Sequence, residues 1–150
     1  MSLLEPPAEV HKYSRVMAFV ISVAVLVGAY FVWYTLRFYP EQKAAEHFFD
    51  AVVAGDMNRA YQLWQPSPSY KLRDFVDDWG PTGYYGPVKS YQIVKKRYPP
   101  GPGSSTVEVR VRISPFSPLP DPNDAEKSQK TKVVNIWIDT KSKSLSMAPP

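Results

Sequence analysis

Residues 16–36 read VMAFVISVAVLVGAYFVWYTL and contain no Asp, Glu, Lys, Arg or His. As an α-helix this segment would measure about 31 Å, which matches the hydrocarbon thickness of a bilayer. Arg15 and Arg37 bound it, so charge resumes where lipid headgroups would begin. A buried core helix is the alternative, but such helices seldom run this long without a polar stripe. The segment therefore predicts a single transmembrane helix.

Two features favour a retained anchor over a cleaved signal peptide. The apolar run exceeds the usual hydrophobic region of about 7–15 residues, and residues 35–40 offer no small-residue cleavage pattern. Aromatic residues also gather at the C-terminal end of the run, which is typical of a membrane–water interface. These residues are Tyr30, Phe31, Trp33, Tyr34, Phe38 and Tyr39.

The predicted anchor divides the chain into three parts. These are a flexible head over residues 1–15, the transmembrane helix over residues 16–36 and an extramembrane domain over residues 37–150. The last part is long enough for one small domain with its own core. Because Lys and Arg flank both ends of the anchor, charge discriminates weakly between orientations. We expect the N-terminus in the cytoplasm and the domain outside it, in the periplasm if the source is a bacterium.

The composition excludes several kinds of chemistry. The chain has no cysteine, so disulfides, thiolate catalysis and cysteine-ligated metal centres are ruled out. Its two histidines, His11 and His47, lie on opposite sides of the anchor and would not jointly hold a haem. The net charge of +4 is modest and indicates an ordinary solvated surface. We therefore predict no cofactor, and any redox chemistry would belong to a partner.

The domain begins with helical periodicity. One helix is predicted over residues 41–54, followed by a stop at Gly55 and by Asp56 as the N-cap of a second helix that ends at Trp64. Ser69 is predicted to cap a third, short helix. The apolar residues recur at helical spacing on one face of each helix. They are Ala45, Phe48, Phe49 and Val52 in the first, Met57, Ala60, Tyr61 and Trp64 in the second, and Leu72, Phe75, Val76 and Trp79 in the third.

From Val88 onward the hydrophobic period falls to two, which predicts strands. We expect strands over residues 88–97, 106–113, 131–139 and 144–147, with a long polar, proline-broken connection over 115–130. In the second strand the inward residues are Val107, Val109, Val111 and Ile113, and the outward ones are Glu108, Arg110 and Arg112. In the third, Val134, Ile136 and Ile138 oppose Val133, Asn135 and Trp137. Helices followed by antiparallel strands predict an α+β domain of about three helices on one face of a curved, four-stranded sheet.

The helical part contains a Gly55-Asp56 junction, and Gly86-Pro87-Val88 precedes the alternating strands. In these features and in the order of its elements, the segment 41–148 resembles the nuclear transport factor 2-like (cone-fold) superfamily. That superfamily includes isomerases, dehydratases, transport factors and many modules without catalytic activity. Membrane-tethered members resemble the inner-membrane assembly component of type IV secretion systems and accessory subunits of bacterial complexes. The fold alone does not choose among these functions.

The resemblance implies that an enzyme of this kind would place a carboxylate inside the cone as a general base, with His or Tyr as a possible partner. The candidates are His47, Asp50, Tyr61, Tyr84 and Tyr85. His47 and Asp50 are three residues apart and could meet on a helix. Both fall at the edge of the predicted buried stripe, however, and no Asp or Glu occupies an inward position of the second strand. We therefore predict that the domain is not an enzyme.

Two surface clusters could bind ions or polyanions. Asp121, Asn123, Asp124 and Glu126 superficially resemble a calcium loop, but the central Gly and the terminal Glu are missing. Lys95-Lys96-Arg97-Tyr98 could join Arg110 and Arg112 in a basic patch on the outer face of the sheet. We predict solvated surfaces for both, with no metal site and no nucleic acid. Anionic lipid headgroups or an acidic partner would suit the basic patch of a tethered domain better.

These observations predict a non-catalytic, single-pass accessory subunit that docks onto a larger integral membrane complex. Respiratory or photosynthetic electron-transport assemblies are conceivable hosts. Small residues spaced by four, at 18 and 22 and at 24 and 28, permit close approach of another helix. Membrane tethering would let weak contacts of the domain act at high effective concentration. The residues predicted to contact partners are Ala24, Gly28, Tyr30, Trp33 and Tyr34 in the anchor, and Arg110, Arg112 and Trp137 on the sheet.

Three alternatives remain open at this point. The chain could be a self-assembling scaffold of a secretion-type assembly. It could be a module that holds an apolar small ligand among Tyr61, Trp64 and Tyr84, although we do not expect a small-molecule ligand. It could also be a tethered isomerase-like enzyme that uses Asp50 or His47.

Overall fold

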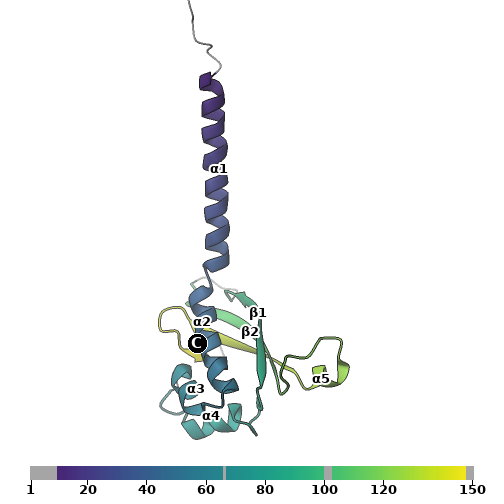
Figure 1. Ribbon diagram of the computed structural model, residues 1–150. Helices are drawn as coiled ribbons and strands as arrows, with labels where there is room; N and C mark the ends of the chain where they lie inside the picture. The colour runs from purple at the N-terminus through teal and green to yellow at the C-terminus, as the bar shows by residue number, and fades with distance from the viewer. Residues whose placement is uncertain (1–9, 66, 100–102, 148–150) are drawn as a thin grey trace, which may run out of the picture. The chain divides into compact units, whose positions relative to one another are not determined.

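The computed structural model of the chain describes residues 10–65, 67–99 and 103–147. The contacts divide the chain into two compact units, Met1–Arg37 and Phe38–Pro150. The first unit contains helix α1, Val10–Leu36 (Figure 1). It begins six residues before the predicted apolar run, because residues 10–15 contain neither proline nor glycine to stop a helix. The other residues of the predicted head, 1–9, lie outside the described residues.

Helix α1 is long and apolar enough to cross a membrane. Its large apolar side chains from Val16 to Leu36 are 43–70% exposed. The Ser22 and Thr35 hydroxyls bond within the helix: Ser22 Oγ donates to the carbonyl of Ala18, and Thr35 Oγ1 donates to that of Val32, both at 2.9 Å. The helix thus satisfies its own backbone and these two aliphatic hydroxyls, and it presents apolar side chains all round, a surface that suits lipid or protein surroundings better than water.

The second unit opens with helices α2 (Tyr39–Val53), α3 (Met57–Trp64) and α4 (Leu72–Trp79). The predicted junction between the first two is confirmed. Gly55 has a φ of +76°, a conformation that favours glycine, and ends the first helix. The Asp56 carboxylate then accepts a hydrogen bond from the backbone N–H of Arg59 at 3.0 Å, which caps α3.

The predicted cap of the third helix is wrong. Helix α4 follows Lys71, whose backbone N–H donates to the Asp74 carboxylate at 2.9 Å. The Ser69 hydroxyl lies 3.0 Å from the Ser67 hydroxyl instead. A carboxylate inside the first turn therefore serves the helix start in place of the serine.

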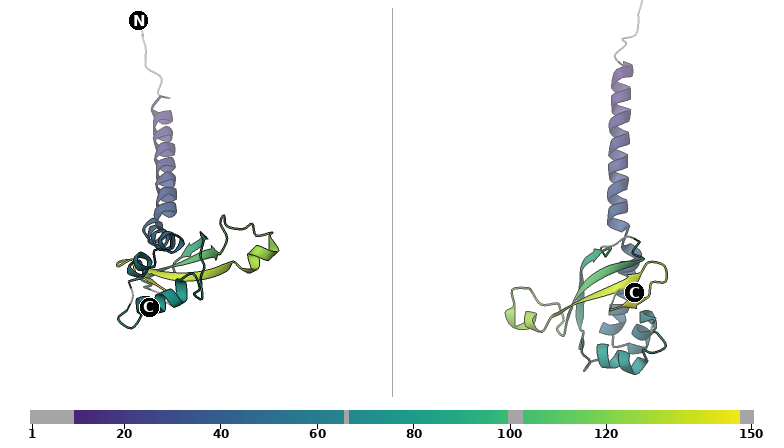
Figure 2. Two further views of the ribbon diagram at one scale, coloured as in Figure 1. Left: turned by 60° about the horizontal axis from the view of Figure 1, so that its bottom comes forward. Right: turned by 180° about the vertical axis from the view of Figure 1, so that it is seen from behind.

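Strands β1 (Ser90–Arg97), β2 (Thr106–Ser114), β3 (Lys132–Asp139) and β4 (Leu145–Ser146) form one open antiparallel sheet in the order β1-β2-β3-β4. Each predicted strand is confirmed, with ends that differ by two residues at most. Helices α2, α3 and α4 lie on one side of this sheet (Figures 1 and 2). The predicted connection over 115–130 contains a helix that was not expected, α5 (Ala125–Gln129), which projects away from α2–α4.

An aromatic cluster fills the space between the helices and the sheet. The Phe48 ring is its centre, with ring centroids 5.0 Å from Phe49, 5.0 Å from Trp64 and 5.2 Å from Trp79. The sheet closes the cluster with the inward residues that period-two alternation predicted. All of them are buried: Val107, Val109, Val111, Ile113, Val134, Ile136 and Ile138.

Strand β1 changes phase in mid-strand. Ile93 pairs with Val111 but Lys95 pairs with Arg110, so one extra residue is inserted between the two pairs. The next residue, Lys96, consequently points to the helix side, where its ammonium donates to Gln42 Oε1 at 2.5 Å. The prediction that Lys96 belongs to the outer basic patch is therefore wrong.

We predict that Phe48→Ala lowers the free energy of unfolding of the domain by about 3–5 kcal/mol, because it leaves a cavity among packed rings. The matched control is Tyr84→Ala, which truncates a ring that is 71% exposed and should cost less than about 1 kcal/mol. Urea unfolding of the full chain in detergent micelles, followed by tryptophan emission, measures both. Equal losses for the two variants would contradict a core centred on Phe48.

Candidate interaction surfaces

The predicted contact residues of the anchor fall on two opposite faces of α1. Tyr30, Trp33 and Tyr34 lie together, with ring centroids 6.1 and 6.3 Å from that of Tyr30. The Arg37 guanidinium carbon extends this face, 4.5 Å from the centre of the Tyr34 ring. At about 100° per residue, Gly28 lies roughly 160° away from Tyr30 around the helix.

Ala24 lies one turn before Gly28, on the same side of the helix. A Cβ added at Gly28 would meet no atom within 4 Å, so this side is smooth and open. One partner helix cannot cover both faces. The structure therefore separates a smooth face, Ala24 and Gly28, from an aromatic face, Tyr30, Trp33, Tyr34 and Arg37. This separation could have been predicted from the sequence, because Tyr30 follows Gly28 by two residues and Ala24 by six, and neither spacing brings two residues to the same side of a helix.

The sheet also has two unlike faces. The core covers one of them, and the outer face carries the residues that alternate with the buried valines. Three rows cross all of β1, β2 and β3: Gln92, Arg112 and Val133; Lys95, Arg110 and Asn135; and Arg97, Glu108 and Trp137. A fourth row on this face consists of Thr106 and Asp139. The predicted contact residues Arg110, Arg112 and Trp137 thus lie in three successive rows of one surface, and all three are partly exposed.

Glu108 lies on the outer face as predicted, yet its exposed fraction is only 5%. Arg97 Nε donates to Glu108 Oε2 at 2.7 Å, across the β1–β2 pair. This hydrogen bond raises the pKa of Arg97, and the charge of the carboxylate adds to the effect. The alternation of residues along β2 does not predict that Glu108 is buried. The burial arises from the longer side chains beside it on the neighbouring strands, Arg97 and Trp137.

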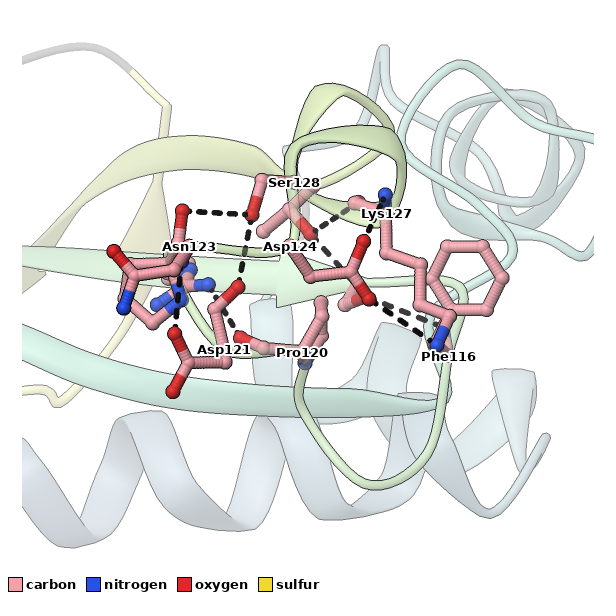
Figure 3. A network of polar contacts seen from close by, with 11 residues as sticks. Phe116, Pro120, Asp121, Asn123, Asp124, Lys127 and Ser128 are labelled. Carbon is pink, nitrogen blue, oxygen red and sulfur yellow. Dashed lines mark hydrogen bonds and ion pairs between the residues drawn. The ribbon is translucent and has the colours of Figure 1, made fainter.

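Arg112 connects the outer face to the β2–β3 connection, residues 115–131, which we call the lobe. Arg112 Nη2 donates to the carbonyl of Pro120 at 2.7 Å, and Ser90 Oγ donates to that of Phe116 at 2.6 Å. Inside the lobe, Ser128 Oγ donates to the carbonyl of Asp121 at 3.1 Å (Figure 3). Hydrogen bonds therefore hold the lobe both to the sheet and to itself. Arg112 has a structural role in addition to any contact with a partner.

The acidic cluster of the lobe is used for local structure. Asp121 Oδ1 accepts a hydrogen bond from the backbone N–H of Asn123 at 2.8 Å. Asp124 Oδ1 accepts one from the backbone N–H of Lys127 at 3.2 Å and caps α5, and this bond lowers the pKa of Asp124. Within the described parts of the chain, no three His, Asp or Glu side chains converge as a metal site would require.

Two pockets adjoin the lobe. The first has a volume of about 550 Å³, and the second, of about 370 Å³, lies on the side of Tyr85 and Lys132. The lining of the first mixes apolar residues with two lysines and two aspartates, so its charge is balanced. The lining residues are Lys89, Pro115, Phe116, Ser117, Pro118, Leu119, Pro120, Asp121, Asp124 and Lys127.

The two residues weighed as catalytic groups, His47 and Asp50, lie at the surface, and Asp50 takes part in a contact between two elements. The Tyr91 hydroxyl donates to Asp50 Oδ1 at 2.6 Å, and its ring stacks on Phe49 with centroids 5.2 Å apart. Asp50 and His47 are both exposed. The carboxylate thus serves as the outer end of a contact between α2 and β1.

The aromatic residues weighed for a ligand site lie in different environments. Trp64 is 7% exposed and belongs to the core, whereas Tyr84 is 71% exposed. The Tyr61 hydroxyl donates to the carbonyl of Tyr70 at 2.8 Å, and the Tyr85 ring stacks on Trp79 at 4.7 Å. The structure does not gather these rings around one space.

We predict that the domain loses stability as the pH rises above about 10. Burial raises the pKa of both Tyr70 and Tyr91, and hydrogen bonds to Asp78 and Asp50 raise it further. Above pH 10 the unfolded chain releases these protons while the folded chain keeps them, so the free energy of unfolding falls. Denaturant unfolding at increasing pH measures the fall. It should be shallower in Tyr91→Phe, and an unchanged slope in that variant would contradict the prediction.

Arg112→Gln should loosen the lobe. Loss of the bond to Pro120 costs about 1–2 kcal/mol locally, which increases the open population about fivefold to thirtyfold. Limited trypsin digestion of the full chain, scored at Lys127 and Lys130, measures the change. Arg110→Gln is the matched control, because Arg110 Nε donates to Asn135 Oδ1 within the sheet and not to the lobe. Equal cleavage rates in the two variants would contradict the brace.

Comparisons of the chain with known protein families, with curated proteins and with solved structures find no match. The chain offers two surfaces to other molecules. One is an apolar helix with a smooth and an aromatic face, and the other is the arginine-rich sheet face of a small α+β domain.

Proposed function

We propose that the chain is a non-catalytic, single-pass membrane accessory subunit that docks onto a larger integral membrane complex and stabilises it. Helix α1 spans the bilayer, and its smooth face, Ala24 and Gly28, packs against a helix of the host. The aromatic face lies at the membrane–water interface, where tyrosine and tryptophan are enriched. The domain contacts the host outside the bilayer.

The exposed apolar surface of α1 carries this proposal. Side chains that are 43–70% exposed along the whole predicted span have no stable place in water, where apolar surface is unfavourable. In lipid the same helix is stable, because its backbone and the hydroxyls of Ser22 and Thr35 bond internally. Small residues then allow another helix to approach closely.

The domain supports a binding role in preference to a catalytic one. The interior between its helices and its sheet is packed with aromatic rings, and the carboxylate weighed as a base, Asp50, accepts a hydrogen bond from Tyr91 at the surface. What the domain offers is an outer sheet face with Arg110, Arg112 and Trp137. Arginine and tryptophan are enriched among residues that dominate interface energies.

We also propose an orientation and a kind of host. We place the N-terminus in the cytoplasm and the domain on the extracytoplasmic side. A respiratory or photosynthetic electron-transport complex is the kind of host we favour. The order of three helices and an antiparallel sheet supports the resemblance to the nuclear transport factor 2-like superfamily, although the sheet is open and does not have the curvature that the resemblance implied.

Carbonate extraction and mild-detergent purification of the full chain from its native membranes test the proposal. We expect the chain to stay in the carbonate-washed membranes and to co-migrate with integral membrane proteins in fixed stoichiometry. Gly28→Leu adds bulk to the smooth face and should reduce co-migration about tenfold or more. Val23→Leu adds bulk near the aromatic face and should leave it unchanged. A chain that is washed off by carbonate, or that migrates alone after solubilisation, would overturn the proposal.

A further inference from the structure

We propose that the outer face of the sheet, centred on Lys95, Arg97, Arg110, Arg112 and Trp137, docks an acidic protein surface. This inference rests on the proposed function, because it names the chemistry of the host surface that the domain contacts. It commits to a protein whose Asp and Glu side chains lie against the arginines.

Charge is concentrated on this face. Four cations, Lys95, Arg97, Arg110 and Arg112, share it with two anions, Glu108 and Asp139, which gives this face a net charge of +2. The whole chain carries +4. Half of the chain's excess positive charge therefore lies on one side of one sheet, where it attracts an acidic surface and steers its approach.

The arginines are held in place before any partner arrives. Arg110 Nε donates to Asn135 Oδ1 at 3.0 Å, and Arg112 Nη2 donates to the carbonyl of Pro120 at 2.7 Å. Each contact uses one of the five N–H donors of a guanidinium, which orients the group while other donors can bind a carboxylate. Such preorganisation reduces the entropy lost on binding.

Apolar groups lie between the charges. Val94 and Val133 are 55% and 60% exposed, and Trp137 is half-buried in the row of Arg97 and Glu108. A protein interface combines aromatic and arginine anchors with apolar area in this way. The face thus offers both kinds of contact that a protein partner needs.

Two other occupants fit less well. Anionic lipid is typically bound by flexible clusters of four to eight Lys or Arg, whereas here three of the four cations are arginines, and two of these bond to the sheet and one to the lobe. A second copy of the chain would bring two like-charged faces together, and that juxtaposition is repulsive.

Site-specific photo-crosslinking in native membranes tests the inference. The chain has no cysteine, so Val133→Cys in the full-length chain provides a single attachment point for a benzophenone label. We expect one crosslinked polypeptide, attached through a segment rich in Asp and Glu. Adding Lys95→Gln and Arg110→Gln, or raising the salt concentration, should reduce its yield about tenfold. Arg112 is left intact because it braces the lobe.

The matched control is Leu72→Cys, on helix α4, which should not give this crosslink. A crosslink from position 133 to lipid, to a second copy of the chain or to a segment without acidic residues would overturn the inference, as would no crosslink. If the chain also co-migrates with its host, the proposed function stands and the acidic partner alone is wrong. If instead co-migration fails but the acidic crosslink forms, the sheet face is confirmed and the integral host is wrong.

Discussion

Packing of aromatic rings around Phe48 is the interaction on which the architecture of the domain depends. Rings from α2, α3 and α4 meet there against the valines and isoleucines of the sheet, and this contact holds the helices to one face. Since side chains fill that face, only the opposite face of the sheet is available to other molecules, together with the lobe and the outer sides of the helices. The core thereby decides which surfaces of the domain can have a function.

The two units present complementary kinds of surface. Helix α1 offers apolar and small side chains, which interact through close packing and depend little on salt. The sheet offers oriented guanidinium groups, whose interactions depend on charge and on distance. Neither surface needs a change of backbone to bind, because helix hydrogen bonds fix the first and strand pairing fixes the second.

Local patterns were sufficient to predict much of this architecture. Alternation in β2 and β3 identified the buried valines, and the Gly55-Asp56 junction located the break between α2 and α3. Three features depend on interactions between distant residues and were missed. The extra residue in β1 turns the Lys96 side chain to the helix side of the sheet. Longer side chains on the neighbouring strands bury Glu108. Arg112 holds a lobe whose helix, α5, has only five residues, too few for a helical period to be recognised in the sequence. Ser69 resembled a cap, but a carboxylate in the first turn of α4 competed successfully for that role.

The burial of Glu108 has a consequence for selectivity. It places a fixed negative charge in the row next to that of Arg110, held there by its bond to Arg97. A partner carboxylate is attracted above Arg110 but repelled if the partner shifts by two residues along β2 toward Glu108. The same carboxylate that reduces the total attraction of this face for an acidic surface would therefore disfavour alignments that are shifted toward it.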